Sequence, residues 1–218
     1  MFAGHFGLAA GIKALDAGVL SKRRTGGQAH ATVITPAPSH PEVPLWALML
    51  STQLLDVAFV FTVIAGVESF GGPAGYGEGW IHAYYTHSLA GALLLAVGAG
   101  LLGARWWGRR GGLLIAGTVF SHWLLDLFVH RPDLPLLPGN LGNLPLLGFG
   151  LWSYPAISIA LEGALVVGGA ALYVASVLQR TADASALRSG DRGRPMLAGG
   201  VTSALLMLAL VTSALGIG

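Results

Sequence analysis

The sequence predicts an all-α membrane protein, a polytopic helical bundle of about six transmembrane helices with both termini outside. Three observations support this prediction. Charged residues are scarce, apolar stretches recur along the whole chain, and almost all basic residues fall into three short loops.

The composition excludes an ordinary soluble domain. Of 218 residues, 54% are hydrophobic and 10% are charged, whereas soluble domains carry about 25% charged residues. Together with the mean hydropathy of +0.68, this shortage predicts that much of the surface faces lipid. The chain has no cysteine, so any bound metal has to use imidazole and carboxylate ligands. Because the basic residues sit between apolar runs, they indicate membrane topology and no nucleic-acid binding.

Six apolar stretches mark the predicted spans. They cover residues 2–20, 44–66, 82–104, 112–130, 152–178 and 195–217. Most reach the roughly 20 residues that a helix needs to cross the hydrocarbon core. We therefore expect a five-helix membrane core over 1–178, a cytoplasmic linker over 179–194 and a C-terminal transmembrane helix over 195–218. The last helix is rich in glycine and is a candidate docking surface for a protein partner.

The basic residues orient the predicted bundle. Apart from Lys13 and Arg131, every lysine and arginine follows the first, third or fifth stretch. With six spans these loops share one side, which the positive-inside rule makes cytoplasmic. Lys13 and Asp16 interrupt the first stretch, so they either snorkel to the inner interface or mark a re-entrant segment. His30 and His40 lie in the first basic loop and are expected to be solvated.

Apart from Lys13 and Asp16, few ionisable side chains lie within the predicted spans. Such groups are costly in lipid, so they mark a functional site or a paired structural site. Counted along the spans, all of them fall between the midplane and the outer surface. They are His5, Asp56, His82, His87, His122, Asp126, His130 and Glu162. His82 lies on a different helix face from His87 and is expected at the interface. The alternative for the rest is simple hydrogen bonding between helices.

The fourth stretch carries the densest pattern. Its His122, Asp126 and His130 are spaced i, i+4 and i+8, so a helix displays them as one stripe. Two ligands at i and i+4 can reach a single divalent ion, as in zinc-binding helices. We therefore expect a metal site that draws on His5, Asp56, His87, His122, Asp126 and His130.

Several strings in the chain resemble the bacterial predicted membrane-bound metal-dependent hydrolases. The strings are GHFGLAA at 4–10, PLWALMLSTQLLD at 44–56, YTHSL at 85–89, SHWLLDLFVHRPDLPL at 121–136 and GLWSYP at 150–155. This resemblance covers residues 1–178 and implies a multi-pass protein of the bacterial inner membrane. It also implies that the six expected ligands and Glu162 match the family's polar positions.

That family is distantly similar to the zinc-dependent phospholipase C and single-strand nuclease superfamily. In that pattern an H-x-x-x-D pair on one helix bridges metals, and His122 with Asp126 fits it. A second helix carries H-x-x-x-E, but here Ser158 stands four residues before Glu162. The resemblance therefore implies one or two zinc or other divalent ions and not three.

Three functions remain open from the sequence. The first is a membrane-embedded metal-dependent hydrolase that cleaves an ester or phosphodiester of a membrane lipid or another amphiphile, with Asp126 or Glu162 as the base. The second is a non-catalytic accessory subunit of a membrane complex, docked through the C-terminal helix. The third is a proton-coupled transporter that uses the same side chains as a relay.

Overall fold

The computed structural model describes residues 2–17, 41–72, 78–187 and 193–214. Helices account for most of them, and the two histidines of the first basic loop, His30 and His40, lie outside the described residues. The helices are α1 (Phe2–Asp16), α3 (Leu45–Thr52), α4 (Leu54–Ile64), α5 (Leu89–Val129), α6 (Pro155–Leu187) and α7 (Gly193–Ala214). Two short 3-10 turns, Pro138–Asn140 and Leu151–Ser153, lie between α5 and α6.

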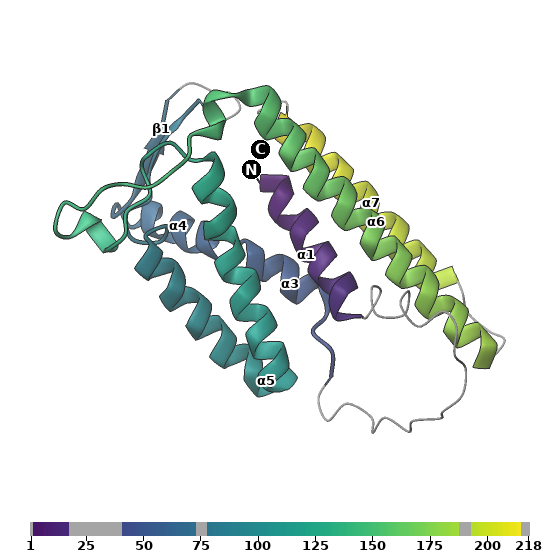
Figure 1. The fold of residues 1–218 in the computed structure, drawn as a ribbon. Helices are drawn as coiled ribbons and strands as arrows, with labels where there is room; N and C mark the ends of the chain where they lie inside the picture. Colours follow the sequence, from purple (N-terminus) through teal and green to yellow (C-terminus); the bar gives the residue numbers. More distant parts are fainter. Residues whose placement is uncertain (1, 18–40, 73–77, 188–192, 215–218) are drawn as a thin grey trace.

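Helix α1 lies in the middle of the bundle. It packs along α6, with α7 behind it, and meets α3 and α5 on its other side (Figure 1). Glycines allow the contact with α6, because a Cβ added at Gly169 would stand 1.9 Å from the carbonyl oxygen of Gly7. This close approach of two backbones is typical of helix pairs in membranes.

Helix α5 is a hairpin of two antiparallel arms that meet at Gly108. This residue has φ 66° and ψ −179°, which is outside the helical region and is strained for any residue with a Cβ. The arms touch closely, since a Cβ on Gly100 would lie 2.8 Å from the Cβ of Ala116 and 2.9 Å from the oxygen of Gly112. The break falls in the basic loop that the sequence predicts between residues 104 and 112.

A two-stranded hairpin departs from the predicted all-α fold. Strands β1 (Ser69–Gly71) and β2 (Trp80–His82) are antiparallel, and Phe70 pairs with Ile81 in their register. The hairpin lies in the segment expected as an outer loop and stands beside the end of α4 in Figure 1. The fold is therefore mostly helical, with a small sheet at the end of the bundle.

The prediction of six spans is wrong. Among the described residues, the helices long and apolar enough to cross a membrane are Leu89–Val129, counted as one helix although its two arms fold back on each other at Gly108, and Pro155–Ala182; α3 and α4 add a third if they form one span bent by 48°. Helix α1 has only 15 residues, and the apolar part of α7 covers Gly199–Thr212. Both are shorter than the roughly 20 residues that a span requires. The outside location of both termini rested on the even number of spans and stays a prediction.

Candidate metal centre

The structure brings all six expected metal ligands to one cavity of about 110 Å³. Three helices supply four of them: α1 carries His5, α4 carries Asp56, and the second arm of α5 carries His122 and Asp126. The other two, His87 and His130, lie just outside the two ends of α5. Phe59, Ile81 and Trp152 complete the lining. The cavity wall thus holds two carboxylates and no lysine or arginine.

Asp126 lies at the centre of the cluster and is almost completely buried. Its Oδ2 is 3.0 Å from Nε2 of His122, one helical turn earlier, and 3.6 Å from Nε2 of His87. Its Oδ1 is 3.3 Å from Nε2 of His5. Asp56 approaches the same histidines from α4, with Oδ1 3.4 Å from Nε2 of His87 and 3.5 Å from Nε2 of His122.

The backbone of α3 fixes the ring of His122. Its Nδ1 lies 2.5 Å from the carbonyl oxygen of Thr52, the last residue of α3, where carbonyls lack partners within the helix. A carbonyl only accepts hydrogen bonds, so Nδ1 carries the proton and donates it. In the neutral ring, Nε2 therefore presents a lone pair to Asp56 and Asp126.

A longer chain of hydrogen bonds fixes His87. Buried Glu68 accepts from the backbone N–H groups of Tyr85 and Thr86, at 2.7 and 3.0 Å, and from the Thr86 hydroxyl at 2.9 Å. The Thr86 hydroxyl has a single proton and donates it to the Glu68 carboxylate. Its oxygen therefore acts as the acceptor for Nδ1 of His87, which lies 3.0 Å away. His87 thus also carries its proton on Nδ1 and a lone pair on Nε2.

His130 is held in the same manner. Its Nδ1 lies 2.9 Å from a carboxylate oxygen of Asp133, just past the end of α5, and its ring centroid lies 4.3 Å from that of Trp152. Partners of this kind on the second ring nitrogen are the usual surroundings of metal-binding histidines, because they set the tautomer and the ring orientation.

These tautomers place lone pairs against carboxylate oxygens. Between His87, His122, Asp56 and Asp126, four Nε2–oxygen distances lie between 3.0 and 3.6 Å, and no proton of the neutral rings lies between these atoms. Such an arrangement needs positive charge between the atoms, which a bound metal ion or protons on the Nε2 atoms would supply. For metal–ligand bonds of about 2.0–2.1 Å, two ligands of a tetrahedral ion are about 3.3 Å apart, which fits the observed distances.

His5 is placed differently. Its ring stacks on that of His122, with centroids 3.9 Å apart and planes 5° from parallel, while its Nδ1 is buried without a hydrogen-bond partner among the described residues. Two overlapping groups can hold a metal ion, His5–His122–Asp126 and Asp56–His87–His122. They share His122, whose single Nε2 lone pair serves one ion at a time.

Glu162 is fully buried on α6, next to the start of α1. Its Oε1 accepts a hydrogen bond from the backbone N–H of Gly4 at 3.1 Å. The first N–H groups of a helix lack partners within the helix and favour a negative charge. Glu162 therefore fixes the first turn of α1, one residue before His5, and the catalytic role expected for it stays a prediction.

Sequence reasoning missed the residues that hold the histidines. Glu68 lies between the second and third predicted spans, and Thr86 occurs only within the string YTHSL, so neither was assigned a role. An acidic residue in so uncharged a chain was the available signal. His82, expected at an interface, is exposed on β2 and lies between the rings of Trp80 and Tyr84, at centroid distances of 4.8 and 5.5 Å.

Comparison with known proteins finds no matching protein family, no matching curated protein and no matching solved structure. The resemblance to membrane-bound hydrolases seen in the sequence gains no support from these comparisons. The structure itself shows the features that the resemblance implied in general terms, namely buried His/Asp groups able to hold a metal ion and long apolar helices.

Proposed function

We propose that this chain is a membrane-embedded metal-dependent hydrolase of the bacterial inner membrane. One divalent ion, zinc by preference, is held by His87, His122, Asp56 and Asp126. The observation that carries the proposal is the set of four Nε2–oxygen distances of 3.0–3.6 Å, because neutral imidazoles and carboxylates at these positions all present lone pairs to one point.

The charge of the site supports a divalent ion. Two carboxylates face the cavity, and its lining has no lysine or arginine to balance them. Buried charges are costly unless they are paired or coordinate a metal. A +2 ion balances both carboxylates, and a ligand set of two imidazoles and two carboxylates suits zinc.

The surroundings of the cavity support an amphiphilic substrate. Phe59, Ile81 and Trp152 line it, and exposed apolar side chains such as Phe70 on β1 and Phe149 stand at the same end of the bundle. A substrate with an apolar part and a polar ester or phosphodiester group meets both kinds of surface.

The chemistry follows from the ion and the neighbouring side chains. A divalent ion in such a site acts as a Lewis acid toward a carbonyl or phosphoryl oxygen and activates water. His130 lines the same cavity, and Asp133 orients its ring. An imidazole held by a carboxylate in this manner is suited to accept a proton from the attacking water, so we assign His130 the role of base.

The test is the metal content of the purified protein. We expect near-stoichiometric zinc, measured by plasma mass spectrometry on protein prepared without chelator or histidine tag. His122→Ala and Asp126→Asn should lose it, whereas His82→Ala, which removes an exposed histidine outside the cavity, should keep it. Absence of metal from the wild type after zinc is added back would refute the proposal.

A proton relay is the second candidate, because the same contacts suit protons shared between imidazole and carboxylate. It predicts a metal-free protein whose proton flux in vesicles depends on His122 and Asp126. The accessory-subunit alternative predicts neither metal nor flux, and a partner that co-purifies through α7. The metal measurement therefore separates the first proposal from both alternatives.

A further inference from the structure

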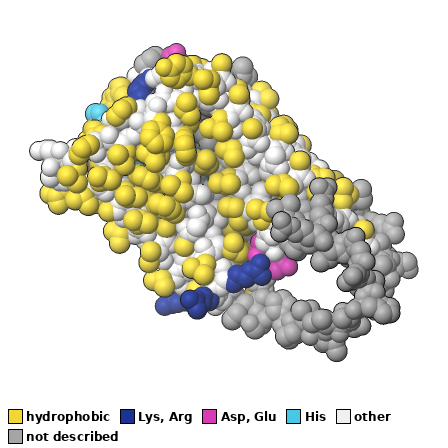
Figure 2. Space-filling model, viewed as in Figure 1, with side chains coloured by type: hydrophobic (Ala, Val, Ile, Leu, Met, Phe, Trp, Pro, Cys, Tyr) yellow, Lys and Arg dark blue, Asp and Glu magenta, His cyan; other side chains and the backbone are white. Residues whose placement is uncertain are grey.

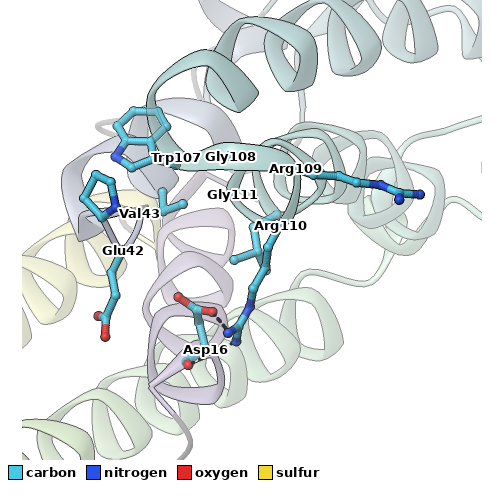
Figure 3. Close-up of a pocket in the computed structure, with 10 residues that line it drawn as sticks. Asp16, Glu42, Val43, Trp107, Gly108, Arg109, Arg110 and Gly111 are labelled. Atoms are coloured by element: carbon cyan, nitrogen blue, oxygen red, sulfur yellow. Dashed lines mark hydrogen bonds and ion pairs between the residues drawn. The ribbon is translucent and has the colours of Figure 1, made fainter. Parts of the chain in front are cut away.

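A second cavity, of about 420 Å³, lies at the turn of α5 (Figure 3). The end of α1, the residues before α3 and the bend at Gly108 enclose it. His122 follows Gly108 by 14 positions, which is about 20 Å along the helix arm, so this cavity is separate from the metal centre. Lysine and arginine side chains gather along this end of the molecule (Figure 2).

The acidic side chains in this cavity already have partners. Asp16 Oδ1 lies 2.7 Å from a guanidinium nitrogen of Arg110, a pair drawn in Figure 3. Glu42 Oε2 lies 3.0 Å from Lys13 Nζ and 3.0 Å from Arg180. The hydrogen bond from Lys13 is the main cause that lowers the pKa of Glu42. Glu42 thus remains ionised at neutral pH, and both carboxylates are paired with cationic side chains.

Arg109 lines the same cavity and has no ion pair or hydrogen bond within the part of the chain that the structure describes. Figure 3 shows its side chain directed away from the Asp16–Arg110 pair. Arg110 is also 78% exposed at its side chain, and a guanidinium has five N–H donors, so it retains donors for another acceptor. The turn of α5 therefore offers positive charge beside the cavity, on Arg109, that no acidic side chain among the described residues satisfies.

An apolar groove adjoins this charge. Arg109 and Arg110 also line a neighbouring hollow of about 500 Å³ together with Leu113 and Leu114. Leu113 is 65% exposed, and Trp106, just before the bend at Gly108, is 57% exposed. Tryptophan at such a position is typical of the membrane–water interface. The two guanidinium groups thus lie between a polar cavity and an apolar groove.

We propose that the turn of α5 around Arg109 and Arg110 binds an anionic phospholipid. Its phosphate accepts hydrogen bonds from Arg109 and Arg110, and an acyl chain lies along Leu113 and Leu114. The planar guanidinium matches a phosphate with two parallel hydrogen bonds, and basic pockets next to membrane helices suit anionic headgroups. The groove explains why the ligand is a lipid and not free phosphate, which has no apolar part.

The experiment measures lipid bound to the full chain in detergent by native mass spectrometry, with phosphatidylglycerol and phosphatidylcholine offered at equal concentration. We expect phosphatidylglycerol to be retained in preference. Arg109→Gln should lower its occupancy about five- to tenfold, as expected from about 1 kcal/mol per basic residue near a lipid headgroup and the additional bidentate contact. The phosphatidylglycerol occupancy of Arg109→Lys should lie between that of the wild type and that of Arg109→Gln.

Arg105→Gln is the matched control, because Arg105 is exposed one turn earlier on α5 and does not line either hollow. Equal losses in Arg105→Gln and Arg109→Gln would show a diffuse surface attraction and refute the site. No preference for phosphatidylglycerol in the wild type would refute it as well. Full displacement by glycerol phosphate would show that the ligand is a soluble phosphate. A thermal unfolding midpoint unchanged in Arg109→Gln separates lost binding from lost folding.

Discussion

The hydrogen-bond chain from Glu68 through Thr86 to His87 gives the sharpest prediction. Thr86→Val replaces the hydroxyl by a methyl group of nearly the same size, so the packing is kept. The variant removes the acceptor for the Nδ1 proton of His87 and a donor to Glu68. We expect weaker metal binding, because the hydroxyl fixes the tautomer that points the Nε2 lone pair toward Asp56 and Asp126.

The magnitude follows from the lost acceptor. A buried N–H without a partner costs about 1–3 kcal/mol, and the ring escapes this cost by moving its proton to Nε2. Metal binding then has to reverse that tautomer. Loss of a partner that orients a metal-binding histidine typically weakens metal binding by about 10–100-fold, which is about 1.4–2.8 kcal/mol at 1.4 kcal/mol per tenfold change.

The assay is competition for zinc against a fluorescent chelator, with the wild type and both variants in the same detergent. Thr62→Val is the matched control, since the Thr62 hydroxyl also reaches Glu68 Oε2 but has no contact with His87. Its zinc affinity should stay within about twofold of the wild type. Equal affinity in Thr86→Val and the wild type would refute the tautomer argument. Equal weakening in both variants would show that the carboxylate's position matters and the proton on His87 does not.

Two further predictions concern the frame around the site. Gly169→Ala should lower the free energy of unfolding by about 1–3 kcal/mol, because its Cβ would lie 1.9 Å from the Gly7 carbonyl oxygen. Gly168→Ala is the control and should not lower it, because the space around Gly168 is open. Equal thermal midpoints of the two variants would contradict the close packing of α1 on α6. The pKa of Glu42 is lowered from its usual value of 4.5, chiefly by the hydrogen bond from Lys13. The pair therefore stabilises the fold fully at a pH above 4.5, and this stabilisation is lost as the pH falls through the lowered pKa. Glu42→Gln should therefore reduce the pH dependence of the unfolding midpoint below pH 4.5, and an unchanged acid limb would contradict this.

The order of residues along one helix was sufficient to predict part of the site. His122 and Asp126 are four positions apart, so any helix through them places both on one face, and the structure finds their side chains 3.0 Å apart. The apolar content likewise predicted helices that face lipid, because a soluble protein of this length would need more charged residues on its surface. The end of the fourth stretch, just before Arg131 and Pro132, follows from the missing N–H of proline.

Hydropathy did not predict the number of spans correctly, because it measures the apolar content of a segment and does not show where a helix ends. Helix α1 ends at Asp16, close to the pair of Lys13 with Glu42, and the second stretch bends by 48° between Thr52 and Leu54. That bend leaves the carbonyl of Thr52 facing His122. The sequence gives no signal for this contact, which joins residues 70 positions apart.

Residue type and helical period were sufficient to predict helices apolar enough to cross a membrane, and to limit the candidate metal ligands to imidazoles and carboxylates. The meeting of His5, Asp56 and His87 with His122 and Asp126 in one cavity could be found only from the three-dimensional fold. The same holds for the role of Glu68 in orienting His87, because such contacts depend on how α1 packs against α6, how α3 and α4 bend, and how the β1–β2 hairpin closes, and none of these is a local property of the chain.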